Sequence, residues 1–269
     1  MWETLIIQPM TNLLLFIYDI FFHNFGIAII LFTILIRLIT APLTRQQMKS
    51  AKSMSELQKS KEWQEIQKKY KDNREKLAQE QMRIYKEMGI NPLGSCLPLL
   101  IQFPIIIGLY QSITRALAVT PLQLFDFSGL IYPFFNAAEL IPINNKFLWM
   151  NLSQPERLMI MGIGIPVLTI LVVITTYLQS KMMTPASASP GDQGAQMSKI
   201  MNLYMPFFMG WISYTLASGL ALYFVTSNVL GIVQYGLTGK VNWRELIRLR
   251  RKSDSPSPSE TVSGVKKSQ

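Results

Sequence analysis

The chain has 269 residues, of which 49% are hydrophobic and only 16% are charged, and its formal net charge is +10. A soluble domain usually carries about a quarter charged residues, so this composition excludes an ordinary soluble enzyme. The single cysteine and single histidine exclude an internal disulfide and a metal site built from several such residues, and we expect no metal, no cofactor and no catalytic group.

Residues 1–24 are apolar but are interrupted by polar side chains such as Asn12 and Asp19. Leu13 and Ile17 belong to a set of apolar residues at helical spacing. This pattern favours an amphipathic helix that lies at the extracytoplasmic interface over a helix that crosses the membrane.

The first membrane span is expected at residues 25–44, FGIAIILFTILIRLITAPLT, with Pro42 closing it near the cytoplasmic interface. Twenty helical residues cover about 30 Å, the thickness of a bilayer's hydrocarbon core. The one charge, Arg37, costs about 2.5–3.5 kcal/mol there. Its side chain either extends to the interface, about 10 Å away, or lies in a hydrated interior. Thr33 and Thr40, on the same helix face, favour water over lipid.

Residues 45–91 are rich in helix formers and hold twelve of the Lys and Arg residues. A polar turn at Asp72 and Asn73 divides the segment, which predicts a cytoplasmic antiparallel helical hairpin. The charged faces of the hairpin are explained if it is a spacer in contact with water, and the alternative is that it is a docking surface.

Four more apolar segments follow, and the basic residues of their loops set the orientation. The expected spans are 95–117, 158–178, 202–216 and 220–237, separated by an extracytoplasmic loop at 118–156 and a cytoplasmic loop at 179–201, and followed by a basic, partly disordered cytoplasmic tail at 238–269. The tail holds eight Lys and Arg residues and the 118–156 loop holds one. Because loops rich in Lys and Arg stay in the cytoplasm, we predict five spans with the N-terminus outside and the C-terminus inside.

The expected spans carry scattered polar side chains and no Asp or Glu. Besides Arg37, Thr33 and Thr40, the predicted site residues among them are Gln102, Thr176, Gln179, Ser227 and Asn228, and Tyr223 and Gln234 recur with Ser227 in the last span. Each alone is explained by a hydrogen bond between helices. Together they indicate a hydrated interior with one fixed positive charge, which would attract an anionic group. An anion-conducting channel, a small-solute transporter and a passive assembly scaffold stay open as alternatives at this point.

The sequence resembles the YidC-type membrane protein insertases from about Asp19 to Thr238. The resemblance rests on ILIRLITAPLT, MKSAKSM, KYKDNREKLAQEQMRIYKEMGINPLGSCLPLLIQFP, FLWMNLSQP, and MPFF followed by SGLALYFVTSNVLGIVQ. The large extracytoplasmic domain of Gram-negative members is absent from this sequence, so the resemblance is to the compact bacterial form.

The resemblance implies an all-α integral membrane protein of the bacterial plasma (inner) membrane, in which five helices enclose a hydrophilic groove open to cytoplasm and lipid. It implies that Arg37 is the groove's arginine and that Gln102 faces the same space. The implied function is a non-enzymatic insertase and chaperone for small membrane proteins.

The implied partners are newly made membrane proteins and the lipid bilayer, with the ribosome and the Sec translocon as candidates and no small-molecule substrate. The basic tail would bind ribosomal RNA or anionic lipid, or would be only a solvated tail. Its candidate docking residues are Lys240, Arg244, Arg248, Arg250, Arg251 and Lys252.

Overall fold

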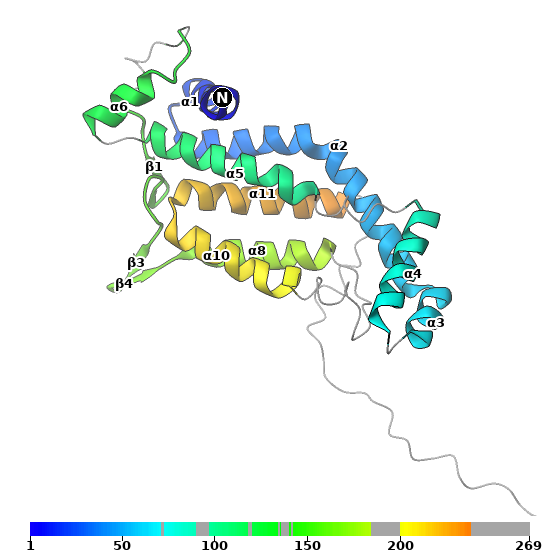
Figure 1. Cartoon of the computed structure of the whole chain (residues 1–269). Coiled ribbons are helices and arrows are strands. Elements are labelled where there is room, and N and C mark those ends of the chain that lie inside the picture. The colour runs from blue at the N-terminus through cyan, green and yellow to red at the C-terminus, as the bar shows by residue number, and fades with distance from the viewer. Residues whose placement is uncertain are drawn as a thin grey trace, which may run out of the picture.

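The computed structural model describes residues 1–70, 73–89, 97–117, 120–133, 135, 140, 142–183 and 200–237. Five helices run side by side along one direction (Figure 1). They are α2 (Phe25–Lys59), α5 (Leu97–Ala116), α8 (Val167–Met183), α10 (Met205–Thr215) and α11 (Ser218–Leu237). The end at which α2, α8 and α11 begin is called the α1 end, after the helix that lies beside it (Figure 1).

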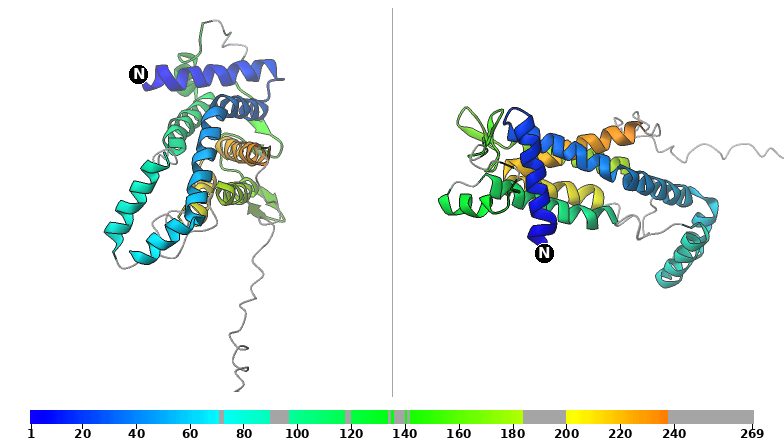
Figure 2. Two further views of the ribbon diagram at one scale, coloured as in Figure 1. Left: turned by 90° about the vertical axis from the view of Figure 1, so that its right-hand side faces the viewer. Right: turned by 90° about the horizontal axis from the view of Figure 1, so that it is seen from above.

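A π-helical turn, η1 (Glu3–Ile7), leads into α1 (Gln8–Ile20), and together they lie across α2 and α5 (Figure 2). The chain then turns through Phe22 and His23, which both have positive φ, of 56° and 52°. Asn24 starts α2 because its side-chain oxygen accepts a hydrogen bond from the Ile27 amide, an N-cap. The predicted segment 1–24 is thus helical from Glu3 to Ile20, and its interfacial, amphipathic role stays a prediction.

The structure corrects the expected end of the first helix. Instead of ending near Pro42, α2 continues to Lys59. A proline removes one backbone donor, and the Gln, Met, Lys and Ala residues that follow are strong helix formers, so the helix resumes. It ends at Ser60, whose hydroxyl caps α3 (Lys61–Lys69) through the Trp63 amide. The predicted separate hairpin is thus a continuation of the first helix.

The predicted helical hairpin is built from the end of α2, α3 and α4 (Arg74–Glu87). Leu57 and Trp63 on one arm pack against Ile84 and Tyr85 on the other, and these four side chains form a small core of their own. This core packs the two arms of the hairpin together. The hairpin lies beyond the end of the bundle that is opposite to α1 (Figure 1). Its cytoplasmic location stays a prediction.

The structure also corrects the expected third span. Residues 158–165 are not helical: β3 (Leu158–Ile160) and β4 (Ile163–Ile165) pair as an antiparallel hairpin. The turn residues Met161 and Gly162 both have positive φ, which suits a tight hairpin turn. An apolar run of this length fits a strand or a helix equally by hydropathy, and α8 begins only after Pro166.

The 118–156 loop contains α6 (Pro121–Ser128), which begins with a capping box at Thr120, and the strands β1 (Lys146–Phe147) and β2 (Met150–Asn151). After a π-helical turn, η3 (Ile200–Tyr204), α10 and α11 follow, and only two residues join them. Cys96, residues 184–199 and the 238–269 tail lie outside the described residues.

Two of the described helices are long and apolar enough to cross a membrane: Phe25–Ser50, within α2, and Ser218–Leu237, which is α11. The segment Val167–Met182 of α8 is apolar but shorter. The number of five spans stays a prediction.

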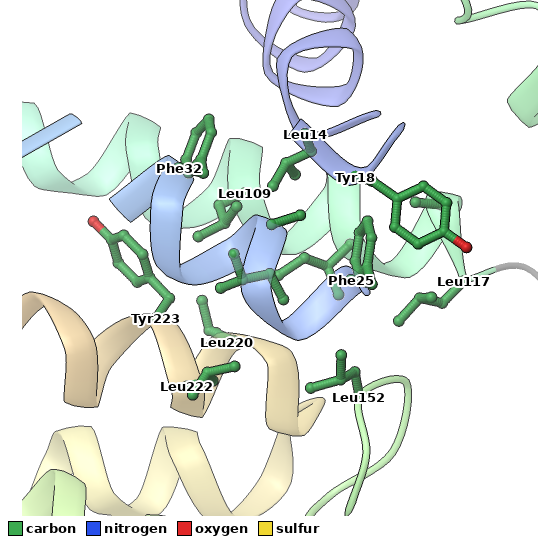
Figure 3. Packing of buried hydrophobic residues seen from close by; sticks show 14 of the residues in the cluster. Leu14, Tyr18, Phe25, Phe32, Leu109, Leu117, Leu152, Leu220, Leu222 and Tyr223 are labelled. Carbon is green, nitrogen blue, oxygen red and sulfur yellow. The ribbon is translucent and has the colours of Figure 1, made fainter. Parts of the chain in front are cut away.

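The main hydrophobic core lies at the α1 end of the bundle (Figure 3). Leu14 and Tyr18 of α1 contact the first turns of α2, where Phe25 and Phe32 are fully buried. Tyr223 of α11 lies at the edge of this core, with its ring among the apolar side chains and its hydroxyl at the border (Figure 3). The packed core therefore fills the bundle on one side of Tyr223, and Ser227 and Arg37 lie on the other.

Candidate functional site

A group of polar side chains, the Arg37 cluster, lies in the bundle beyond Tyr223. The cluster consists of Arg37 on α2, Gln102 on α5, Gln179 on α8, and Tyr223 and Ser227 on α11. Arg37 follows Phe32 of the apolar core by five residues, about 8 Å along the helix. The α11 members fall four residues apart, and Gly231 follows at the same interval, so all three share one helix face.

Arg37 reaches α11, where its Nε donates a hydrogen bond to the Ser227 hydroxyl at 3.0 Å. This bond fixes one side of the guanidinium and leaves the two terminal nitrogens as further donors. Within the described part of the chain, Arg37 forms no ion pair with a carboxylate. Arg37 as a whole residue is neither fully buried nor fully exposed, and the bond to Ser227 holds its positive charge in place inside the bundle.

A second hydrogen bond joins α5 to the same face of α11. The side-chain amide nitrogen of Gln102 donates to the Tyr223 hydroxyl at 2.6 Å. Only 2% of the Tyr223 surface is exposed, and Ser227 follows it by four residues on the same face of α11. The Gln102–Tyr223 and Arg37–Ser227 bonds therefore lie about one helical turn apart and join α5 and α2 to one face of α11.

Gly231 allows α8 to join the cluster. A Cβ placed at Gly231 would lie 2.6 Å from Gln179 Nε2 and 3.4 Å from Arg37 Nη2. The space that a side chain would fill is thus occupied by the ends of these two side chains. Glycine at this position brings the amide of α8 and the guanidinium of α2 together against the α11 backbone.

Asn228 uses the neighbouring face of α11 and binds α8 directly. Its Nδ2 donates to the Thr176 hydroxyl at 2.8 Å and to the Thr175 hydroxyl at 3.1 Å. Asn228 and Thr175 are both 9% exposed, so this contact lies inside the bundle. The predicted residues Thr176 and Asn228 therefore bind each other and join α8 to α11 beside the Arg37 cluster.

The hydroxyls of Thr33 and Thr40 form hydrogen bonds within α2, the helix on which both residues lie. The Thr33 hydroxyl is fully buried and donates to the Ile29 carbonyl at 2.6 Å, and the Thr40 hydroxyl donates to the Ile36 carbonyl at 2.8 Å. Such bonds satisfy a hydroxyl without an external partner. Their role in binding stays a prediction. The tail residues Lys240, Arg244, Arg248, Arg250, Arg251 and Lys252 lie outside the described residues.

Three residues of the site were not among the predicted site residues. Tyr223 binds Gln102 one helical turn before Ser227, Gly231 makes the space for Gln179, and Thr175 shares Asn228 with Thr176. The four-residue spacing of Tyr223 and Gly231 from Ser227 was the available signal. Thr175 has no such signal, because only the packing of α8 against α11 selects it.

The arrangement can attract an anionic group and offer it several hydrogen-bond donors. Arginine is suited to carboxylates because its two terminal nitrogens can donate side by side. Among the described residues, no three His, Cys, Asp or Glu side chains come together as a metal site. The site is thus suited to reversible binding by charge and hydrogen bonding.

Comparisons with known proteins agree on one family. The family described as "60Kd inner membrane protein" matches residues 16–243. A membrane protein insertase YidC from Oceanobacillus iheyensis is 33% identical over 245 residues, which is 89% of this chain and 84% of the relative. One from Clostridium perfringens is 37% identical over 244 residues, which is 85% of this chain and 89% of the relative.

A solved structure, described as an active YidC insertase with its first transmembrane domain resolved, is similar with a TM-score of 0.50 and 26% identity. The similarity covers 84% of this chain and 44% of the solved chain. The match therefore extends over most of this chain but over less than half of that protein.

Proposed function

The chain belongs to the family of the 60Kd inner membrane proteins and YidC insertases, and from this premise we propose that it inserts newly made membrane proteins by holding an anionic client segment at Arg37. The relatives named above are membrane protein insertases, and insertion into lipid is the function that this chain shares with them. We further propose a groove, a role for each site residue and an orientation of the chain in the membrane.

The observation that carries the proposal is how the Arg37 guanidinium is hydrogen-bonded and paired. Its Nε is used by Ser227, while its terminal nitrogens are left for another acceptor and no carboxylate among the described residues pairs with it. A charge in a membrane costs free energy unless it has a function or a partner. We infer that the partner is the client, which is present only during insertion.

The client would present an acidic N-terminal tail or loop to the Arg37 cluster. Two opposite charges about 4 Å apart attract by about 4 kcal/mol at an effective dielectric constant near 20, a typical value close to a protein surface. The membrane potential then favours outward movement of each negative charge by about 2.3 kcal/mol per 100 mV. The cluster would therefore lower the barrier to a transfer that the membrane potential helps to complete.

The hydrophobic part of the client would pass into lipid along the outside of the bundle. Phe207, Phe208 and Trp211 of α10 and Ile174 of α8 are large exposed apolar side chains, and they suit contact with acyl chains. The packed core at the α1 end argues for a site that opens toward the opposite end and sideways, which is the groove expected from the resemblance. No covalent bond is made or broken in this scheme.

The proposal includes five spans in the bacterial plasma membrane, with the N-terminus outside and the C-terminus in the cytoplasm. The twelve Lys and Arg residues at 45–86 support this orientation, because such segments stay in the cytoplasm. The ribosome and the Sec translocon are the candidate partners of the basic helices and of the 238–269 tail.

The test uses the purified protein in liposomes and a single-span client with an acidic N-terminal tail. Insertion is measured as protection of the tail from added protease. We expect Arg37→Ala to reduce insertion by roughly tenfold or more, since loss of about 1.4 kcal/mol of binding is a tenfold effect. Arg37→Lys should keep part of the activity because it retains the charge but not the bond geometry.

The matched control is Arg115→Ala, which removes another arginine of a bundle helix, one that is paired with Glu3 at 2.7 Å. It should insert the client normally. A client whose acidic tail residues are replaced by Lys should lose its dependence on Arg37. Normal insertion by Arg37→Ala would overturn the proposed role, and chloride flux without client would instead favour an anion channel.

A further inference from the structure

The Gln179 side chain ends beside the Arg37 guanidinium, although the two residues come from different helices. Helix α11 lies between α2, which carries Arg37, and α8, which carries Gln179 (Figure 1). Gln179 Nε2 and Arg37 Nη2 lie 2.6 and 3.4 Å from one point, the position that a Cβ on Gly231 would take. The two nitrogens are therefore close neighbours against the backbone of α11.

Both of these nitrogens are hydrogen-bond donors. The amide nitrogen of glutamine and the terminal nitrogens of arginine carry hydrogens and accept nothing, so the two groups cannot bind each other through these atoms. Arg37 donates through Nε to Ser227. Within the described part of the chain, the Gln179 side chain forms no hydrogen bond. The two donors are thus arranged for an acceptor that comes from outside this part of the chain.

The neighbouring turn of the same helices shows what a packing contact looks like. The Asn228 amide joins α11 to α8 by donating to the Thr175 and Thr176 hydroxyls. Three residues later on each helix, Gly231 meets Gln179, and the glycine offers space instead of a hydrogen-bond partner. Polar side chains that only join helices bond across the contact. Gln179 does not follow this pattern, so its amide has another use.

Two contacts set the positions of the donors. The Ser227 hydroxyl accepts from Arg37 Nε and so fixes the plane of the guanidinium. Gly231 leaves room for the Gln179 amide, because a Cβ at 2.6 Å from Nε2 would be closer than such atoms pack. The donors are positioned before a client arrives, and binding does not have to order them.

We propose that Gln179 is a specificity-determining residue, which holds the carboxylate of a client Asp or Glu side chain together with Arg37. One carboxylate oxygen accepts from Arg37 Nη2 and the other from Gln179 Nε2. A guanidinium alone attracts any anion, whereas two donors set close together favour a group with two acceptor oxygens on one carbon. This inference rests on the proposed function and adds the chemical class of the group that is held.

The test compares two single-span clients in the liposome assay, which differ only in whether the tail carries Asp or Asn. The ratio of protected Asp tails to protected Asn tails measures the preference for a carboxylate. Gln179→Leu has a similar volume and no donor. It should lower this ratio by about threefold to tenfold, the effect of one hydrogen bond, and leave insertion of the Asn client unchanged.

The matched control is Gln111→Leu, which changes a glutamine of α5 at the α1 end of the bundle. The Gln111 side-chain oxygen accepts from Trp2 Nε1 at 2.9 Å, away from the Arg37 cluster. This variant should keep the preference for the Asp client.

Gln179→Glu is the second variant, because it keeps the length and shape of the side chain and places a carboxylate beside Arg37. That carboxylate accepts from the guanidinium as the client does. It should therefore lower insertion of the Asp client to the level of Arg37→Ala and leave the Asn client inserting normally. Normal insertion of the Asp client by Gln179→Glu would overturn the inference.

The two clients separate binding from packing. An equal fall for both clients in Gln179→Leu would show a packing role and overturn the inference, and so would an unchanged ratio. An unchanged ratio in Gln179→Leu, together with a lowered ratio in Arg37→Ala, would leave the proposed role of Arg37 standing. Normal insertion of the Asp client by Arg37→Ala would instead overturn the proposed function itself.

Discussion

Arg37 and Ser227, which are 190 residues apart in the chain, meet across the contact between α2 and α11, with Nε donating to the hydroxyl at 3.0 Å. The bond sets the plane of the guanidinium, and the plane decides where its two terminal nitrogens point. Ser227 is therefore part of the site through its effect on Arg37.

Ser227→Ala should reduce insertion of an acidic-tail client severalfold, and less than Arg37→Ala does. The positive charge remains, but the hydrogen bond that orients the guanidinium is lost. Ser227→Thr keeps the hydroxyl and should be nearly normal. In the liposome assay, Arg37→Ala combined with Ser227→Ala should be no worse than Arg37→Ala alone, because the two residues act as one unit. Additive losses would contradict this.

Gly231→Val should lower both insertion and thermal stability. Even a Cβ at Gly231 would be 2.6 Å from Gln179 Nε2, so a branched side chain must displace Gln179 and crowd Arg37. The measurement is the unfolding temperature in detergent alongside insertion. Gln179→Ala should partly restore stability in the double variant, since it empties the contested space. No rescue would mean that the strain lies elsewhere.

Asn228→Leu should destabilise the bundle by about 1–2 kcal/mol, because hydrogen bonds between helices in membranes average about 0.6 and reach about 1.7 kcal/mol. It removes the bonds to Thr175 and Thr176. Unfolding in mixed micelles of increasing denaturing-detergent content measures the effect. Val229→Ala, at the adjacent exposed position, is the control and should change little. Equal stability of the two variants would remove the structural role of Asn228.

Glu156→Ala should destabilise the α1 end by about 1–3 kcal/mol, the cost of leaving a buried donor unpaired. The Leu168 amide at the start of α8 is the donor that water reaches least, since Leu168 is 4% exposed. Glu156→Gln keeps an acceptor oxygen and should lose less. A shift of about 2–4 °C per kcal/mol in the unfolding temperature is expected for a chain of this size. Identical behaviour of the two variants would contradict the argument.

The helices that sequence predicted best are those with uniform hydropathy. Residues 220–237 were expected as a helix, and α11 runs from Ser218 to Leu237. Two boundaries were wrong for a physical reason. Pro42 was expected to end the first span, but a proline costs one hydrogen bond and the next residues favour helix. Residues 158–165 were expected to be helical, although Gly162 and Gly164 are signals against a continuous helix, and Gly162 has the positive φ of a turn residue.

The site shows a similar division. The polar residues of the spans could be identified from sequence, because a polar side chain in a membrane helix usually has a role in helix packing or in binding. Their partners could not be chosen, because the pairing of Arg37 with Ser227, and of Asn228 with Thr176, depends on the packing and rotation of α2, α8 and α11. Thr33 and Thr40 look equivalent to these residues in sequence, and only the structure shows that each binds its own helix.

The continuity of α2 makes Arg37 and the basic helices α3 and α4 parts of one mechanical element. At about 1.5 Å per residue, the helix between Arg37 and Lys59 is a lever of about 33 Å. Pro42, a little over one turn beyond Arg37, is where such a lever bends most easily. A large particle that pushes on the far arm would therefore bend α2 at Pro42, close to Arg37, and such a bend would change the surroundings of Arg37 without any contact between the particle and the arginine.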